Sequence, residues 1–186
     1  MGNQSAAQKE ELKAITRKFK ISKSDVKVYQ KLFKQHCPKG NHLSRKDFKS
    51  VYNQLFPGDC SEFADQMFRT FDTDGDGKVD FLEFLTGLCM TDSDDVNEKI
   101  EWAFKMYDVD GNGTISMDEV KKLSMAYYKM IYGYENQEES ESVAKELFQL
   151  MDKDNDEKIT FQEFNDAAKK NSEILNMLFP SPQDEG

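Results

Sequence analysis

The sequence has few of the residues that mark secreted, fibrous or membrane-spanning proteins. Only three of its 186 residues are cysteine, four are proline and ten are glycine. Three scattered cysteines do not make the even disulfide framework of a small secreted domain, so they favour a reduced, intracellular environment. The low proline and glycine content excludes collagen-like and low-complexity chains. No apolar run approaches the roughly 18 residues that a membrane-spanning helix needs, and the polar first residues do not resemble a signal peptide.

Positive charge is too scarce for a general nucleic-acid-binding protein. The chain has 35 acidic and 25 basic residues, a net charge of −10, whereas nucleic-acid binding relies on basic surfaces. The bases gather in residues 1–59, while residues 72–83, 108–119 and 152–163 hold fourteen acids and three bases. An ordinary solvated acidic surface would spread its charge. Acids packed this closely repel one another unless a cation lies among them.

The three acidic windows are copies of one repeated unit. They read DTDGDGKVDFLE, DVDGNGTISMDE and DKDNDEKITFQE, and a degraded copy, HCPKGNHLSRKD, begins at His36. Apolar residues spaced by three and four flank each acidic window; Ile100, Phe104 and Tyr107, for example, precede the second. This spacing is typical of one face of a helix. The sequence therefore predicts four helix–loop–helix units.

The acidic windows place oxygen atoms where a calcium ion needs them. Calcium binds six to eight oxygens, and a twelve-residue loop between two helices, the EF-hand, supplies them from positions 1, 3, 5, 7, 9 and 12. The predicted ligands are Asp72, Asp74, Asp76, Lys78, Asp80 and Glu83 in the first acidic loop, Asp108, Asp110, Asn112, Thr114, Ser116 and Glu119 in the second, and Asp152, Asp154, Asp156, Lys158, Thr160 and Glu163 in the third. At position 7 the ligand is the backbone carbonyl. Acidic surface loops without metal are the alternative, which three matches in register disfavour.

Two of the four loops depart from this pattern. The third acidic loop has Glu157 at position 6, where glycine is expected. A positive φ there costs a side-chain-bearing residue roughly 1–2 kcal/mol, which predicts calcium binding about tenfold weaker than in a glycine loop. In the degenerate loop, residues 36–47, Pro38 and Gly40 occupy positions 3 and 5. We therefore predict that this loop does not bind calcium.

Position 8 is apolar in every loop, which predicts how the loops pair. We expect Leu43 to meet Val79 and Ile115 to meet Ile159 in short strand contacts. The predicted fold is all-α: four EF-hands in two paired lobes, the first hand degenerate, with a minimal two-stranded β contact in each pair. The expected boundaries are 1–21 for an N-terminal arm with a short helix, 22–90 for the N-terminal lobe, 91–95 for a hinge, 96–170 for the C-terminal lobe and 171–186 for a C-terminal helix and tail.

Several motifs together resemble the neuronal calcium sensor family, which includes recoverin, visinin-like proteins and frequenin. They are Met1-Gly2, Cys37-Pro38 in the degenerate loop, Phe56-Pro57, and the segment EKIEWAFKMYD at residues 98–108. The resemblance spans nearly the whole chain and implies a calcium sensor that is not an enzyme. It also implies a cytoplasmic protein that associates with membranes. The degenerate loop departs from the family by one extra residue, through Asn41, and the tail after Phe179 matches no member.

The N-terminus carries a candidate lipidation signal. Met1-Gly2 permits N-myristoylation of Gly2, although Ala6 stands where the motif has serine or threonine. The resemblance implies a myristoyl group on Gly2; an unmodified N-terminus is the alternative. One such chain binds membranes only marginally, so attraction of bases to anionic lipid would supply a second signal. The candidate bases, which otherwise form an ordinary solvated helix face, are Lys9, Lys13, Arg17, Lys18 and Lys20.

The resemblance also implies a groove that binds an amphipathic helix of a membrane-associated target, such as a cyclase, kinase, channel or receptor. The candidate groove residues, which could equally be plain core, are Tyr29, Phe33, Phe48, Val51, Tyr52, Phe56, Phe84, Leu85 and Leu88. We expect up to three Ca²⁺ ions to open this groove, with Mg²⁺ competing for some sites at rest. A calcium buffer is the first alternative. A calcium-triggered photoprotein is the second, but its usual order of live and dead loops is reversed here.

Overall fold

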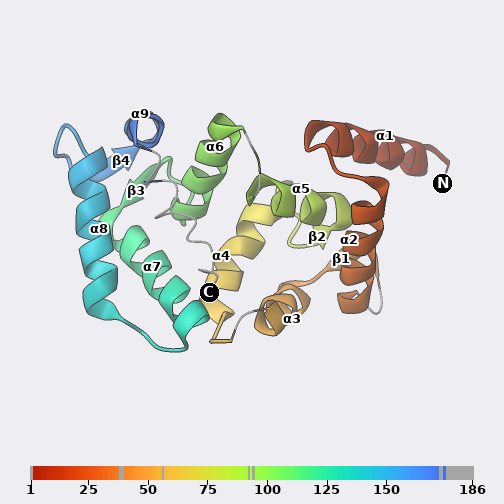
Figure 1. The fold of residues 1–186 in the computed structure, drawn as a ribbon, viewed down its shortest axis with the longest axis horizontal. Helices are drawn as coiled ribbons and strands as arrows, with labels where there is room; N and C mark the ends of the chain where they lie inside the picture. Colours follow the sequence, from red (N-terminus) through yellow and green to blue (C-terminus); the bar gives the residue numbers. More distant parts are fainter. Residues whose placement is uncertain are drawn as a thin grey trace.

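The computed structural model describes residues 2–37, 40–55, 57–91, 93, 95–171 and 174. Within these residues the chain is almost entirely helical, with four very short strands (Figure 1). The helices are α1 (Gly2–Lys18), α2 (Lys23–His36), α3 (Arg45–Leu55), α4 (Ser61–Phe71), α5 (Phe81–Thr91), α6 (Val96–Tyr107), α7 (Met117–Tyr132), α8 (Gln137–Met151) and α9 (Phe161–Lys170). Each predicted loop therefore lies between two helices, as an EF-hand requires.

The strands join the loops in the predicted pairs. Strand β1 (His42–Leu43) is antiparallel to β2 (Val79–Asp80), and β3 (Thr114–Ser116) is antiparallel to β4 (Lys158–Thr160). Leu43 lies opposite Val79, and Ile115 lies opposite Ile159. All four of these side chains are buried. The predicted all-α fold with two paired lobes is confirmed.

Several helices begin with the same reciprocal hydrogen bonds. The Ser22 hydroxyl accepts a bond from the Asp25 backbone N–H, and the Asp25 carboxylate accepts one from the Ser22 N–H. Ser44 and Asp47 repeat this capping box at α3. Equivalent boxes begin α7 and α9, where the capping residues also match the metal-ligand pattern.

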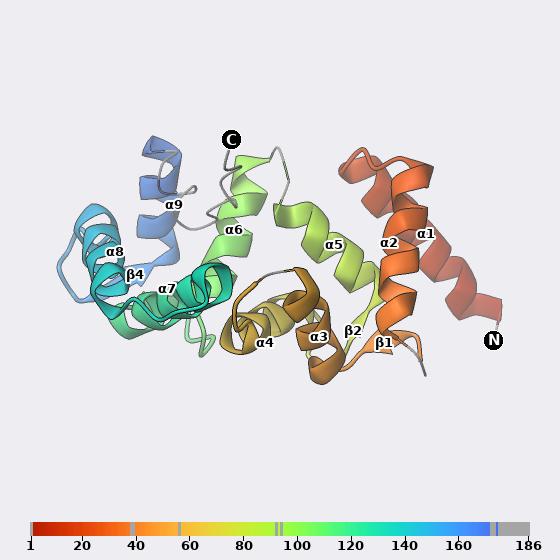
Figure 2. The ribbon, with the colours of Figure 1, turned by 60° about the horizontal axis from the view of Figure 1, so that its bottom comes forward.

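The two lobes share one continuous hydrophobic core. Helix α4 lies between them and contacts both α6 and α7 (Figure 2). The rings of Phe71 in α4 and Trp102 in α6 are 5.4 Å apart, edge to face. At the other end of α4, the Gly58 N–H donates to the carbonyl of Met130 in α7 at 3.0 Å. The lobes are therefore packed together directly, in addition to their connection through residues 91–95.

Helix α1 lies against the N-terminal lobe. Its Ile15 is buried with Leu85 and Cys89 of α5, and Leu12 and Phe19 pack around them. Helix α1 is longer than the short helix expected from sequence, since it reaches from Gly2 to Lys18. No helix in the described part of the chain is long and apolar enough to cross a bilayer.

Candidate calcium sites

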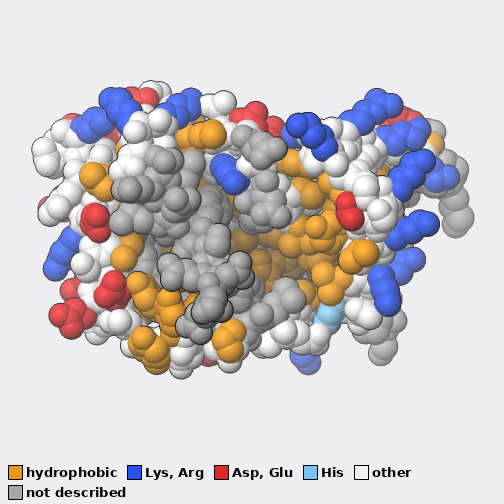
Figure 3. Space-filling view, in the orientation of Figure 1, with side chains coloured by type: hydrophobic (Ala, Val, Ile, Leu, Met, Phe, Trp, Pro, Cys, Tyr) orange, Lys and Arg blue, Asp and Glu red, His pale blue; other side chains and the backbone are white. Residues whose placement is uncertain are grey.

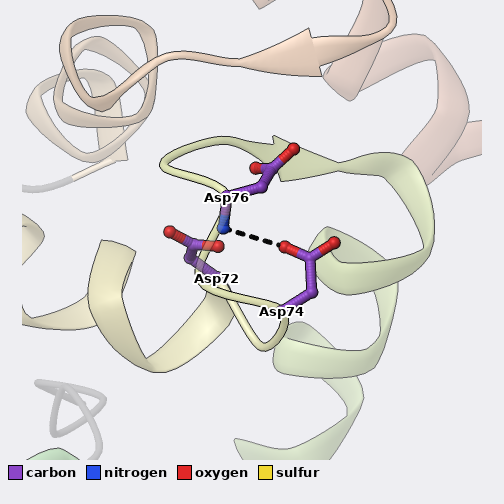
Figure 4. A group of neighbouring side chains, drawn as sticks. All are labelled: Asp72, Asp74 and Asp76. Carbon is purple, nitrogen blue, oxygen red and sulfur yellow. Dashed lines mark hydrogen bonds between the residues drawn. The ribbon is translucent and has the colours of Figure 1, made fainter.

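The first ligand of each acidic loop directly follows a helix. Asp72, Asp108 and Asp152 are the C-cap residues of α4, α6 and α8. Each lies in a cluster of acidic side chains whose ligand oxygens lie within 4.8 Å of one another. These clusters are Asp72, Asp74 and Asp76 (Figure 4), Asp108, Asp110 and Glu119, and Asp152, Asp154 and Glu163. The structure thus brings together acids that the sequence separates by up to eleven positions.

Hydrogen bonds inside the first acidic loop (72–83) turn its side chains inward. Asp72 Oδ2 accepts a bond from the Gly77 N–H at 2.9 Å, and Asp74 Oδ1 accepts one from the Asp76 N–H at 3.1 Å (Figure 4). Asp76 Oδ1 accepts a bond from the Lys78 N–H at 2.8 Å. These bonds leave other carboxylate lone pairs available to a cation.

In the acidic loops, two ligand carboxylates each have a buried oxygen without a hydrogen-bond partner among the described residues. Asp72 Oδ1 and Asp152 Oδ1 are buried and accept no hydrogen bond. A buried, unpaired carboxylate oxygen is costly, and nearly all buried polar atoms in folded proteins are satisfied. A hard cation that binds oxygen would satisfy both atoms. This donor set of carboxylate, amide and carbonyl oxygens fits calcium.

The glutamate at position 12 holds the two ends of each loop together. In the first loop, Glu83 Oε1 accepts a bond from the Thr73 N–H at 2.9 Å, and Oε2 accepts one from the Asp80 N–H at 3.0 Å. Glu119 and Glu163 make the equivalent bonds in the second and third acidic loops. The sequence did not indicate that the backbone N–H groups at positions 2 and 9 donate hydrogen bonds to the glutamate at position 12.

The ionisation of Glu163 follows from these contacts. Burial by itself would raise the pKa of its carboxyl group. Hydrogen bonds from Thr160, Lys153 and Asp154 outweigh burial, and the pKa of Glu163 is lowered. The carboxyl group is therefore favoured in the charged form that binds a metal ion.

The backbone has a positive φ at positions 4 and 6 of every acidic loop. Glycine fills both positions in the first and second loops, with φ between 71° and 85°. The third loop has Asn155 with φ 58° and Glu157 with φ 64°. The predicted left-handed conformation of Glu157 is confirmed. The sequence pattern does not indicate the left-handed Asn155, because it names glycine only at position 6.

The degenerate loop keeps the frame of an EF-hand without its ligands. In its described part, no cluster of three metal-binding side chains occurs. Its Asp47 at position 12 binds Ser44 instead. Pro38, which we expected to remove a ligand at position 3, lies outside the described residues. The loop therefore serves as a partner strand for the first acidic loop.

Known proteins share both the loops and the chain as a whole. The EF-hand domain pair family matches residues 97–169, and the EF hand domain family matches residues 63–91. The chain is 36% identical to recoverin of Homo sapiens, over 98% of this chain and 96% of the relative. It is 37% identical to neuronal calcium sensor 1 of Lymnaea stagnalis, over 91% of this chain and 89% of the relative. The chain belongs to the neuronal calcium sensor family. The predicted resemblance is confirmed, and this neuronal calcium sensor is a calcium-binding protein and not an enzyme.

The groove residues predicted for this neuronal calcium sensor lie in the N-terminal lobe but divide between two apolar clusters, with Leu85 and Tyr29 in the cluster that α1 covers. Phe33, Phe48, Val51, Phe84 and Leu85 are buried in this conformation, and Tyr29, Tyr52 and Leu88 are half-buried. Phe56 lies outside the described residues. Hydrophobic side chains gather in a hollow between α2 and α4 on the face drawn in Figure 3. The predicted lipidation site, Gly2, is the first residue of α1.

Proposed function

We propose that the protein binds up to three Ca²⁺ ions and converts binding into exposure of an apolar groove that regulates a membrane-associated target. The observation that carries this proposal is the place of Glu83. This ligand lies in the first turn of α5, and the next residues of α5 are the groove residues Phe84, Leu85 and Leu88. One rigid helix therefore joins a calcium ligand to the groove wall.

Movement of Glu83 would be transmitted to the contact between α5 and α2. The ring of Phe84 is 5.4 Å from that of Phe33 in α2, and Phe81 is 5.6 Å from the same ring. When calcium draws the position-12 glutamate inward in a sensor, the exiting helix swings and apolar surface is exposed. Separating α5 from α2 would uncover these rings. An amphipathic helix of a partner could then bind through its apolar face.

The N-terminal helix would take part in the same opening. Helix α1 covers Leu85 and Cys89 with Ile15, so a shift of α5 would loosen α1 as well. Because α1 begins at Gly2, the same movement would change the position of a myristoyl group there. This arrangement supports a groove and a lipid that respond to calcium together.

An anionic membrane surface fits the charge of the N-terminal lobe. Lys and Arg side chains gather at the edge formed by α1 and α2 (Figure 3). Two of the five predicted bases form ion pairs, Lys13 with Glu10 at 2.6 Å and Lys18 with Glu98 at 2.7 Å. No ion pair is found within the described residues for Lys9, Arg17 or Lys20. These cations would add attraction to anionic lipid, about 1 kcal/mol each near the surface.

The test is a calcium titration of N-myristoylated protein against about 1 mM Mg²⁺. Trp102 is the reporter, because it contacts Phe71, the residue before the ligand Asp72. We expect Trp102 emission, binding of an apolar dye, and binding to vesicles containing phosphatidylserine to rise over one calcium range. Glu83→Gln is the matched control and should retain binding at the other loops while losing most of the dye response.

A different outcome would favour the buffer alternative. If calcium binds at all three loops while dye and vesicle binding stay constant, the groove does not open and the sensor mechanism is wrong. If magnesium at this level also prevents calcium binding, the loops are Ca²⁺/Mg²⁺ buffer sites.

A further inference from the structure

Two polar side chains of the N-terminal lobe reach the other lobe, one at the end of α6 and one at the start of the second acidic loop (108–119). Gln66 Nε2 donates to the Met106 carbonyl at 2.6 Å, and Arg69 Nη1 donates to the Val109 carbonyl at 3.0 Å. Gln66 and Arg69 are three residues apart and therefore lie on one face of α4. This face meets α6 where the lobes pack together (Figure 2).

The carbonyls that receive these bonds lie where α6 ends. Helix α6 stops at Tyr107, so the last carbonyls have no partner within the helix. The positive charge of Arg69 also suits the negative end of a helix dipole. Asp108, the first ligand of the loop, lies between Met106 and Val109. Helix α4 thus holds the backbone on both sides of a calcium ligand in the other lobe.

The peptide groups of Val109 connect Arg69 to a second ligand. The Val109 N–H donates to Glu119 Oε1 at 2.8 Å, while its carbonyl accepts the bond from Arg69. Glu119 is the position-12 ligand. Three residues after Arg69, Asp72 caps the C-terminal end of α4 and is the first ligand of the first acidic loop. A continuous set of contacts therefore leads from Glu119 through Val109 and α4 to Asp72.

We propose that Gln66 and Arg69 are positioning residues that couple the second acidic loop to the first across the lobe interface. A calcium ion at Glu119 fixes the Val109 peptide, which restrains Arg69 and the end of α4. Asp72 is then ordered before its own ion arrives, so the first loop binds more tightly. The coupling is reciprocal, as linkage requires. This inference rests on the proposed function, since it needs calcium at both loops.

The experiment is a double-mutant cycle measured by calorimetric calcium titration of the full chain. Glu163→Gln disables the third acidic loop in every protein, so that two sites remain. Glu119→Gln then removes the second loop and leaves the first alone. Arg69→Met is introduced into both backgrounds. We expect Arg69→Met to weaken the first loop by roughly fivefold when the second loop is live, and to leave its affinity unchanged when Glu119 is replaced.

Matched variants separate coupling from general damage. Arg45→Met removes the same kind of side chain from α3, which contacts α4 within the N-terminal lobe, where Arg45 lies 3.6 Å from Asp65 and over the Phe68 ring. Arg45→Met should leave the coupling between the two loops unchanged. Gln66→Met removes the other bond across the interface at similar volume and should reduce coupling as Arg69→Met does. A melting curve confirms that each variant is folded at the temperature of titration.

The outcomes distinguish this inference from the proposed function. If Arg69→Met and Gln66→Met weaken the first loop equally in both backgrounds, or in neither, the coupling is absent and the inference is wrong. If the Glu163→Gln protein binds no calcium at either remaining loop, the proposed function itself fails.

Discussion

The degenerate loop (36–47) and the first acidic loop (72–83) are paired partners with the same frame and different chemistry. Both contribute a buried apolar residue to the short sheet, Leu43 and Val79. Both use position 9 to begin the exiting helix, through Ser44 and Asp80. The first acidic loop gathers three carboxylates, whereas the degenerate loop uses its one carboxylate as a helix cap. The comparison teaches that the frame of an EF-hand is stable without the metal-binding function.

The largest predicted effect is at position 12, where the first acidic loop has a calcium ligand and the degenerate loop has a helix cap. Glu83→Gln removes a bidentate calcium ligand, and we expect the affinity of the first loop to fall about a hundredfold, or about 2.7 kcal/mol. Asp47→Asn at the same position of the degenerate loop should leave all calcium affinities unchanged. It should instead lower the free energy of unfolding by up to about 1 kcal/mol, because it weakens a helix cap.

Calorimetric titration measures the calcium affinities, and chemical denaturation measures the free energy of unfolding. A calcium affinity that falls with Asp47→Asn would show that the degenerate loop contributes to metal binding, contrary to the structure.

The third acidic loop (152–163) is intermediate between these two loops, because it keeps the ligands but lacks the glycine at position 6. Glu157→Gly should tighten calcium binding there about tenfold, because the left-handed conformation costs a side-chain-bearing residue roughly 1–2 kcal/mol. The reciprocal change, Gly77→Glu, should weaken the first loop by a similar factor. Asn155→Gly should have a smaller effect, about twofold, because asparagine adopts this conformation more readily. Titrations in which the other loops are disabled would measure each change; equal affinities for Glu157 and glycine would refute the strain argument.

The prediction with the least bearing on calcium binding concerns position 2, where the degenerate loop has Cys37. Burial, and after it the charge of Asp47, raises the pKa of the Cys37 thiol from 9.0 to about 11. The reactive thiolate is lost when pH falls below the pKa, so at pH 8 its fraction is roughly a hundredfold smaller than for a thiol of pKa 9. Alkylation followed by mass spectrometry should find Cys37 slow at pH 8 and faster above pH 10. Asp47→Asn should increase the rate. Rapid alkylation of Cys37 at pH 8 would contradict this prediction.

The loop frame could be predicted because it depends on local chemistry. Ligand spacing, the apolar residue at position 8 and the glycine at position 6 act within twelve residues, so the pairing of Leu43 with Val79 and the strained Glu157 followed from sequence. The left-handed Asn155 did not, because asparagine is common in loops of many conformations. The capping boxes at Ser116 and Thr160 were hidden by the second role of these residues as ligands.

The sequence by itself determined the family, the three acidic loops and their pairing, since each is written in the spacing of neighbouring residues. Only the tertiary structure decided how the lobes meet. Gln66 contacts Met106, and Arg69 contacts Val109, each across forty positions, and no periodicity in either helix marks them as partners. The physical reason is that a helix repeats its faces every 3.6 residues, which identifies a buried face without specifying what covers it.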